Sequence, residues 1–295
     1  MKLNYFRLGS SALLLALVAS CAPLGQQTAP APTRSSYADA TATRDGNLAL
    51  GNPSGAVTDA TNYPNNYLLT KTQYTLSYSR DQGKPNWVSW HLSAAWLGST
   101  ARQDNFAADA SLPSAWYHVG STSYSGSGFD RGHNCPSADR TGSVADNSAT
   151  FLMSNMMPQA PTNNQQTWAG LENYCRTLVN AGNELYIIAG SYGKGGTGTN
   201  GAATTIDGGR ITVPSNCWKV VVVLPVGTSD VSRITSSTRV IAINTPNTNA
   251  ISTSWGSYRT TVNAIENATG YDLLSAVSGT VQSTIESKVD TGPTN

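Results

Sequence analysis

Charged side chains are scarce in this sequence. Lys, Arg, Asp and Glu together make up 12% of the 295 residues, which is about half the fraction found in an average soluble domain. This scarcity excludes a coiled coil and a charge-driven disordered chain, and seven Trp with 13 Tyr can fill a core. The net charge of +1 also excludes a strongly basic nucleic-acid-binding protein, although it does not exclude a local basic cluster.

Histidine, cysteine and several hydrolase motifs are also scarce or absent. Three His residues without H-x-x-H or H-E-x-x-H spacing argue against a zinc hydrolase, and four Cys residues without C-x-x-C spacing argue against a zinc knuckle. The lack of G-x-S-x-G disfavours an α/β-hydrolase. Residues 193–198 are rich in Gly but lack the order of a phosphate-binding loop, so they are predicted to form an ordinary loop.

The N-terminus has the features of an export signal. Lys2 and Arg7 precede an apolar run at residues 12–19, which is too short to span the ~30 Å core of a bilayer. The run leads into Val18-Ala19-Ser20-Cys21, which resembles a bacterial lipobox and predicts a signal peptide over residues 1–20 and lipidation of Cys21. The alternative is an ordinary signal peptide with a chance cysteine. Acyl chains would anchor the chain stably, so we expect an exported, membrane-anchored lipoprotein at the cell envelope or surface.

Composition divides the rest of the chain into a linker, one domain and a tail. Residues 21–46 are rich in Ala, Pro, Thr, Ser and Gln, which predicts a flexible linker behind the lipidated cysteine. No second linker or repeat interrupts residues 47–285, and residues 286–295 are predicted to be a loose tail. Export would place three further cysteines in a potentially oxidising compartment, where they could form at most one internal disulfide. These are Cys135, Cys175 and Cys217.

Hydrophobic patterning predicts an α+β domain. Residues 74–78 alternate and residues 87–92 follow a Gly-Lys-Pro turn, which predicts a β-hairpin. Further strands are predicted from short, β-branched apolar runs at residues 184–189, 217–224 and 239–243. Helical spacing predicts one helix over residues 165–179 and another over residues 258–268 that ends at Gly270. Because strands and helices do not alternate regularly, α+β is favoured over a doubly wound sheet.

Side chains able to do chemistry are concentrated between residues 128 and 176. Asp130, Arg131 and His133 lie within four positions of one another. A second set steps by four along the predicted helix and would occupy one stripe about 120° wide. This set is Asn164, Trp168, Glu172 and Arg176. Taken separately, these residues have ordinary interpretations. Asn164 could be a helix N-cap, Glu172 and Arg176 an i,i+4 surface pair, and His133 a structural histidine. An amide, a carboxylate and a guanidinium on one stripe suit neither a core face nor a plain solvent face.

These residues resemble the DNA/RNA non-specific endonucleases, a ββα-metal family. The D-R-G-H signature is at residues 130–133, the N-x-x-P-Q segment at residues 155–159 and the N-Q-x-x-W-x-x-L-E helix at residues 164–172. The resemblance continues through residues 182–190, 213–214, 217–220 and 265–270. It covers roughly residues 48–275 and implies a His-Me finger nuclease fold, in which helices flank a central antiparallel sheet.

The resemblance implies an endonuclease that hydrolyses phosphodiester bonds of DNA and RNA to 5′-phosphate ends, with Mg²⁺, or alternatively Mn²⁺, as cofactor. It implies His133 as the general base, since a neutral imidazole can take a proton near neutral pH. It implies Asn164 as the direct metal ligand and Glu172 as a ligand through water, because Mg²⁺ keeps several waters and few protein ligands. The remaining implied site residues are Arg102, Arg131 and Arg176 as phosphate contacts and Asp130 as an orienting residue.

Two alternatives remain open at this point. A catalytically silent surface lipoprotein could use the fold only to bind nucleic acid, but His133, Asn164 and the arginines would then be dispensable, and all are present. A phosphodiesterase restricted to small or modified substrates would retain the same residues. The other two histidines are expected to be ordinary, His91 as a structural residue in a strand and His118 as a surface residue in a loop.

Overall fold

The computed structural model describes residues 41–295. The predicted signal peptide, Cys21 and most of the predicted linker lie outside these residues. Within the described part, none of the helices has the length and apolar character needed to cross a membrane.

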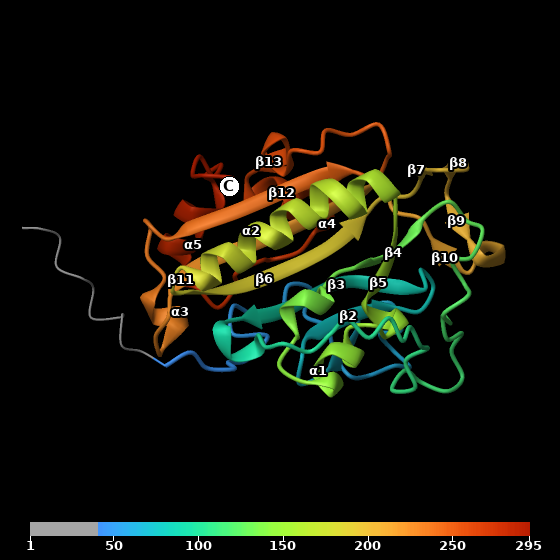
Figure 1. The fold of residues 1–295 in the computed structure, drawn as a ribbon, viewed down its shortest axis with the longest axis horizontal. Helices are drawn as coiled ribbons and strands as arrows, with labels where there is room; N and C mark the ends of the chain where they lie inside the picture. Colours follow the sequence, from blue (N-terminus) through green and yellow to red (C-terminus); the bar gives the residue numbers. More distant parts are fainter. Residues whose placement is uncertain (1–40) are drawn as a thin grey trace, which may run out of the picture. The chain divides into compact units, whose positions relative to one another are not determined.

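One large antiparallel sheet dominates residues 41–295 (Figure 1). Its spatial order is β1 (Tyr67–Thr70), β2 (Thr75–Ser79), β3 (Lys84–Leu92), β6 (Asn183–Tyr192), β11 (Asn216–Pro225), β12 (Arg239–Pro246) and β13 (Arg259–Thr260). The predicted hairpin is confirmed by the antiparallel pairing of β2 with β3, but its turn precedes Lys84 and includes Gly83, with φ of 62°. The three predicted central strands are confirmed as β6, β11 and β12.

Three short two-stranded sheets accompany the large sheet in the described residues. They are β4 (Asp130–His133) with β5 (Met156–Gln159), β7 (Gly196–Gly198) with β8 (Gly201–Ala203), and β9 (Thr205–Ile206) with β10 (Ile211–Thr212). The glycine-rich segment predicted to be a plain loop therefore contains strand β7, because Gly201, with φ of 98°, allows the chain to turn back on itself.

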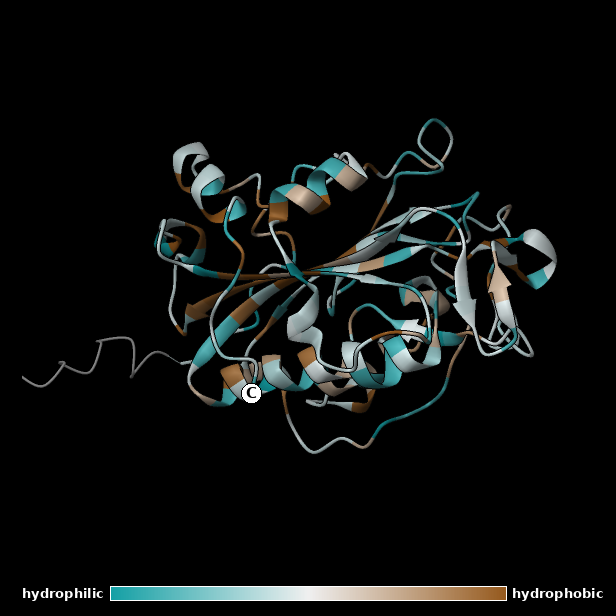
Figure 2. Ribbon diagram, turned by 90° about the horizontal axis from the view of Figure 1, so that it is seen from above, coloured by the Kyte–Doolittle hydropathy of each residue, from teal (hydrophilic) through white to brown (hydrophobic). Residues whose placement is uncertain are grey.

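Helices cover both faces of the sheet (Figure 2). They are α1 (Val144–Ala149), α2 (Ala169–Asn180), α3 (Asp230–Arg233), α4 (Val262–Thr269) and α5 (Gly279–Glu286). The predicted helix over residues 165–179 begins as a π-helical turn, Asn163–Trp168, and continues as α2. The predicted helix over residues 258–268 starts later, at Val262, because Arg259–Thr260 pairs with β12, and it ends as predicted at the left-handed Gly270.

Two hydrophobic cores follow from the alternation of side chains along the central strands. Ile187 on β6 and Val221 on β11 face the helix α2, which contributes Leu171. Their neighbours Ile188 and Val220 face the opposite way, toward a core that includes residues of α4 and α5. The matching segment at residues 164–172 therefore packs on the α2 side of the sheet, whereas the segment at residues 265–270 belongs to α4 and packs on the opposite side.

The C-terminal segment is bonded to the sheet. Asp290 accepts hydrogen bonds from Arg239 on β12 at 2.8 and 2.9 Å and forms an ion pair with Arg259 on β13. Arg239 also donates to the Pro293 carbonyl. The segment predicted to be a loose tail is therefore held by a partly buried carboxylate. In the described chain Cys135, Cys175 and Cys217 are buried free thiols.

The Glu286 carboxyl gives a testable pH dependence of stability. It is 5% exposed, and its Oε1 has no hydrogen-bond partner in the described chain. Burial raises the pKa of Glu286 from 4.5 to about 7, so its contribution to stability is lost as the pH rises through this interval. We expect Glu286→Gln to raise Tm relative to the parent protein at pH 8 and to raise it much less at pH 4.5. An equal difference in Tm at the two pH values would contradict ionisation as the cause.

Candidate functional site

Strands β4 and β5, the π-helical turn and α2 form a continuous scaffold for the predicted site residues. His133 at the end of β4 pairs with Met156, and Gly132 pairs with Met157. A Cβ on Gly132 would lie 2.4 Å from Gln159 Oε1, so only glycine allows the two strands to pack this closely. The D-R-G-H segment therefore sets the position of the His133 ring through the close approach of Gly132 to the Gln159 side chain.

His133 is held as a neutral imidazole in an apolar cage. Its side chain packs edge-on against Phe106 and Phe151, with ring centroids 5.6 and 5.0 Å away. Burial, followed by the positive charges of Arg102 and Arg131, lowers the pKa of His133 to about 3, although a hydrogen bond with the Arg131 backbone opposes this shift. Nε2 is buried and has no hydrogen-bond partner in residues 41–295, so its lone pair is available to accept a proton.

A pocket of about 350 Å³ adjoins this cage. It is lined by Arg102, Asp104, Phe106, Ser121, Tyr124, Ser125, Phe129, Asp130, Arg131 and Asn164. The Arg131 guanidinium lies 3.7 Å from the Phe106 ring centroid and donates to the Ser121 carbonyl. The Arg102 guanidinium lies 4.8 Å from the Phe151 ring centroid. The two guanidinium groups in the lining can bind an anionic group, and Arg102 also forms an ion pair with Asp104 at 2.6 Å.

Asn164 lines the same pocket with a defined amide orientation. Its Nδ2 donates to Asp130 Oδ2 at 2.8 Å, and Gln165 Nε2 donates to the same oxygen. This leaves Asn164 Oδ1 as the atom that can bind a hard cation. Asn164 belongs to the π-helical turn, a type of distortion that is frequent at functional sites. The orienting role predicted for Asp130 agrees with these bonds and stays a prediction.

Glu172 and Arg176 lie farther along α2, outside the pocket lining, and each has an acidic or basic partner. Lys219 Nζ lies 3.2 Å from Glu172 Oε1. Burial raises the pKa of Glu172, and the charge of Lys219 opposes this shift. Arg176 donates to Asp139 Oδ1 at 2.7 Å. The predicted phosphate contact is therefore engaged by a buried carboxylate in this structure.

Trp168 joins the helix to the strand that carries the histidine. It is fully buried, and its Nε1 donates to the His133 carbonyl at 3.3 Å. The predicted stripe along the helix therefore includes a core residue, Trp168, as well as a residue that lines the pocket, Asn164. Sequence reasoning missed two charged partners, Lys219 and Asp139. The first lies in the C-W-K-V segment that matched the family pattern, whereas no motif indicated the second.

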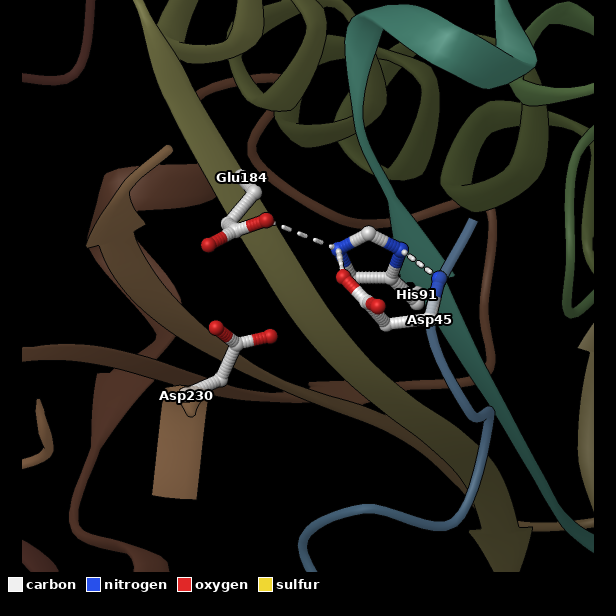
Figure 3. A group of neighbouring side chains, drawn as sticks. All are labelled: Asp45, His91, Glu184 and Asp230. Carbon is white, nitrogen blue, oxygen red and sulfur yellow. Dashed lines mark hydrogen bonds and ion pairs between the residues drawn. The ribbon is translucent and has the colours of Figure 1, made fainter. Parts of the chain in front are cut away.

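A separate group of side chains lies close enough together to hold a metal ion (Figure 3). The group consists of Asp45, His91, Glu184 and Asp230, with one ligand atom of each within 4.8 Å of the others. His91 Nδ1 accepts a hydrogen bond from the Asp45 amide, so Nε2 carries the ring proton and faces Glu184 Oε2 at 3.4 Å. Arg233 donates to both Glu184 and Asp230. These contacts form a network on the face of the sheet opposite α2, in which His91, Glu184 and Asp230 are buried and Asp45 is partly exposed.

The other two predicted ordinary histidines differ in their surroundings. His91 belongs to this buried network, as a structural residue of β3. The side chain of His118 is partly buried, and its Nε2 lies 3.0 Å from the Pro113 carbonyl oxygen, within the same loop. Neither residue lines the pocket beside His133.

The sequence of this chain is similar to a known protein family and to several known proteins. A family model described as DNA/RNA non-specific endonuclease matches residues 52–280. A protein named nuclease from Nostoc sp. is 48% identical over 279 residues, covering 95% of this chain and 96% of its own. Human mitochondrial endonuclease G is 30% identical over 166 residues, covering 54% of this chain and 56% of its own.

A solved structure has the same fold. A chain from the crystal structure of the EndoG/EndoGI complex aligns with a TM-score of 0.62 at 21% identity. The alignment covers 79% of this chain and 91% of that chain. The predicted fold class, an α+β ββα-metal architecture with a central antiparallel sheet flanked by helices, is therefore confirmed.

Proposed function

This chain belongs to the DNA/RNA non-specific endonuclease family and is a nucleic-acid hydrolase, and from this we propose that it cuts both DNA and RNA, using Mg²⁺ and leaving 5′-phosphate ends. The observation that carries the proposal is the unpartnered Nε2 of a neutral His133 beside a pocket lined by two arginines. Mn²⁺ is the alternative cofactor.

The chain's own residues account for the steps of hydrolysis. Arg102 and Arg131 would bind the phosphate that enters the pocket, since guanidinium groups match phosphate oxygens in charge and geometry. His133 Nε2 would accept a proton from the attacking water. Asn164 would hold the cation through Oδ1, and Glu172 through a water molecule. When bound, the cation neutralises the negative charge that develops on the leaving 3′-oxygen.

The donor set fits a magnesium-type cation. Asp130 holds the Asn164 amide so that oxygen, the donor atom that hard cations prefer, is left unengaged. Glu172 supplies a carboxylate farther along the same helix. The group around His91 is less suitable for this role, because it lies on the other face of the sheet and Arg233 already occupies two of its carboxylates.

Lack of sequence specificity follows from contacts that read phosphate and not bases. Arginine contacts to the backbone fix the position of a nucleic acid but carry no base information. The near-neutral net charge of +1 is compatible with an enzyme that must release its product. We accordingly assign binding to local cations and not to a global positive field.

We also propose that the protein is exported and anchored by lipid on Cys21, as its lipobox-like segment indicates. Mass spectrometry of the protein purified from cell membranes should show Cys21 as the modified N-terminal residue. Cys21→Ser should release the protein from the membrane fraction. An unmodified Cys21, or cleavage elsewhere, would refute the proposal.

The His133 environment predicts different pH profiles for the two kinetic constants. In the free enzyme burial and two arginines lower the pKa of His133 to about 3, so the acid limb of kcat/KM should lie well below pH 6.5. A bound phosphate would offset the arginine charges, so the acid limb of kcat should lie at higher pH. Coincident limbs near pH 6.5 would contradict this environment.

The proposal is tested by digestion of a closed circular plasmid and of RNA, each with Mg²⁺, with EDTA, and with Mg²⁺ restored. We expect both polymers to be cleaved, EDTA to stop cleavage and restored Mg²⁺ to recover it. End-labelling should detect 5′-phosphate ends. Binding without cleavage would favour the catalytically silent alternative. Cleavage of a small phosphodiester but of neither polymer would favour the narrower phosphodiesterase.

A further inference from the structure

Lys219 is a buried cation at the centre of the large sheet. It lies on β11, between Ala189 of β6 and Ile243 of β12, and is 1% exposed. Its side chain points to the α2 face, since Val221 two residues on belongs to the core on that side. A charge is costly in such a place unless a specific partner compensates it.

The partners of Lys219 are a carboxylate and two indole rings. Nζ lies 3.2 Å from Glu172 Oε1, 4.2 Å from the Trp168 ring centroid and 5.6 Å from the Trp90 ring centroid. Cation–π contacts of this kind stabilise an ammonium group that has left water. The ammonium is thus fixed by two aromatic rings while it binds one oxygen of Glu172.

Trp168 connects Lys219 to the proposed general base, His133. Trp168, which lies under the ammonium, donates its indole N–H to the His133 carbonyl. Glu172 is in the first turn of α2, directly after Trp168 and the π-helical turn that carries Asn164. Lys219 is therefore one of the points at which the sheet contacts the helix that presents the proposed cation ligands.

We infer that Lys219 is a positioning residue for the nuclease reaction, which binds Oε1 of Glu172 and thereby leaves Oε2 for the coordination shell of the catalytic cation. The inference rests on the proposed function. Among the described residues, Lys219 is the cation that forms a salt bridge with Glu172, with Nζ 3.2 Å from Oε1. Without the ammonium, this carboxylate would lose both its charge support and its fixed orientation.

The first test measures cation binding without substrate. Mn²⁺ alone is titrated by electron paramagnetic resonance into the full chain and into Lys219→Met. We expect Mn²⁺ affinity to fall by about tenfold or more, the range for loss of a group that supports a ligand, and Lys219→Arg to recover part of it. The matched control is Lys84→Met, because Lys84 is also 1% exposed, on β3 of the same sheet, but has no contact with Glu172.

The second test is a double-mutant cycle with Glu172→Gln, measured on Mn²⁺ affinity and on kcat for plasmid cleavage. If Lys219 acts through Glu172, adding Lys219→Met to Glu172→Gln should change neither quantity further. Additive losses would overturn the inference while leaving the proposed function in place. If Glu172→Gln alone changes neither quantity, the role of Glu172 in the proposed function fails first.

Folding of the variants is checked by circular dichroism and Tm. Where Lys219→Met does not fold, Lys219→Arg enters the same cycle, since it keeps the charge but changes its position. Non-additivity with Glu172→Gln then supports the inference, and additivity refutes it. KM for plasmid should stay unchanged in either Lys219 variant, because Lys219 is assigned no contact with phosphate.

Discussion

Replacement of His133 by Ala should lower kcat by about 10²–10⁴-fold, the usual contribution of a general base. The structure gives the reason, since Nε2 is the unpartnered atom of a neutral ring and its removal leaves no other histidine beside the pocket. Binding of nucleic acid and Mn²⁺ should change little, because the arginines and Asn164 remain. The measurements are kcat and KM for plasmid and Mn²⁺ affinity in the absence of substrate.

Two controls separate chemistry from folding in this variant. Removing a ring that packs against both Phe106 and Phe151 creates a cavity, so Tm is expected to fall and must be measured alongside activity. His118→Ala is the matched histidine control and should retain kcat, since His118 contacts the Pro113 carbonyl outside the pocket. A fall of less than about tenfold in a folded His133→Ala protein would exclude a general-base role.

Asn164→Ala and Arg176→Ala should have large but different effects. Loss of the Asn164 oxygen should reduce activity by about a hundredfold or more and should be partly reversed by higher Mg²⁺. Arg176→Ala should mainly raise KM and make binding less dependent on salt, as expected for loss of a phosphate contact. Added Mg²⁺ should not restore it. The measurements are kcat and KM over a range of Mg²⁺ and salt concentrations.

Because Arg176 forms an ion pair with Asp139, the comparison of the Asn164 and Arg176 variants needs a control for loss of that ion pair. Arg176→Ala leaves Asp139 buried with a hydrogen bond from Trp90 but without its cation, which destabilises the fold. The double variant Arg176→Ala with Asp139→Asn removes that unpaired charge and should recover Tm without recovering KM. If the Asn164 and Arg176 variants fold and respond identically to Mg²⁺, their assignment to separate roles is wrong.

The strands and helices were predicted well, because the spacing of apolar residues within a segment depends on which sides of that segment are buried. Alternation at residues 74–78 and β-branched runs at residues 184–189 are confirmed as strands of one sheet. The start of the helix over residues 165–179 was harder to predict. A π-helical turn has hydrogen bonds between residues five apart, but the spacing of its apolar residues still resembles that of an α-helix. The pattern found the segment but missed its first turn.

The candidate site residues were named one by one from the sequence, and their roles stay predictions, whereas the electrostatics of the site were not predicted. The spacing of the motifs predicted that His133 and Asn164 belong to one site. In the structure His133 lies on β4 and Asn164 in the π-helical turn. The partner of Glu172 is 47 residues away in the chain, at Lys219, and that contact exists only once β11 and α2 have packed together. The desolvation that lowers the pKa of His133 likewise depends on the tertiary cage and has no local signal.

The pairing of β3 with β6 has a consequence for folding kinetics. These neighbours are joined through the whole segment of residues 93–182, which contains β4, β5 and α2. Closing so long a loop adds little to the equilibrium cost, because that cost grows only with the logarithm of loop length, but non-local pairing slows folding. We expect the segment to form its local contacts first and the sheet to close afterwards. A chain caught before closure would have β4 and β5 paired yet lack the contact between Trp90 on β3 and Lys219 on β11.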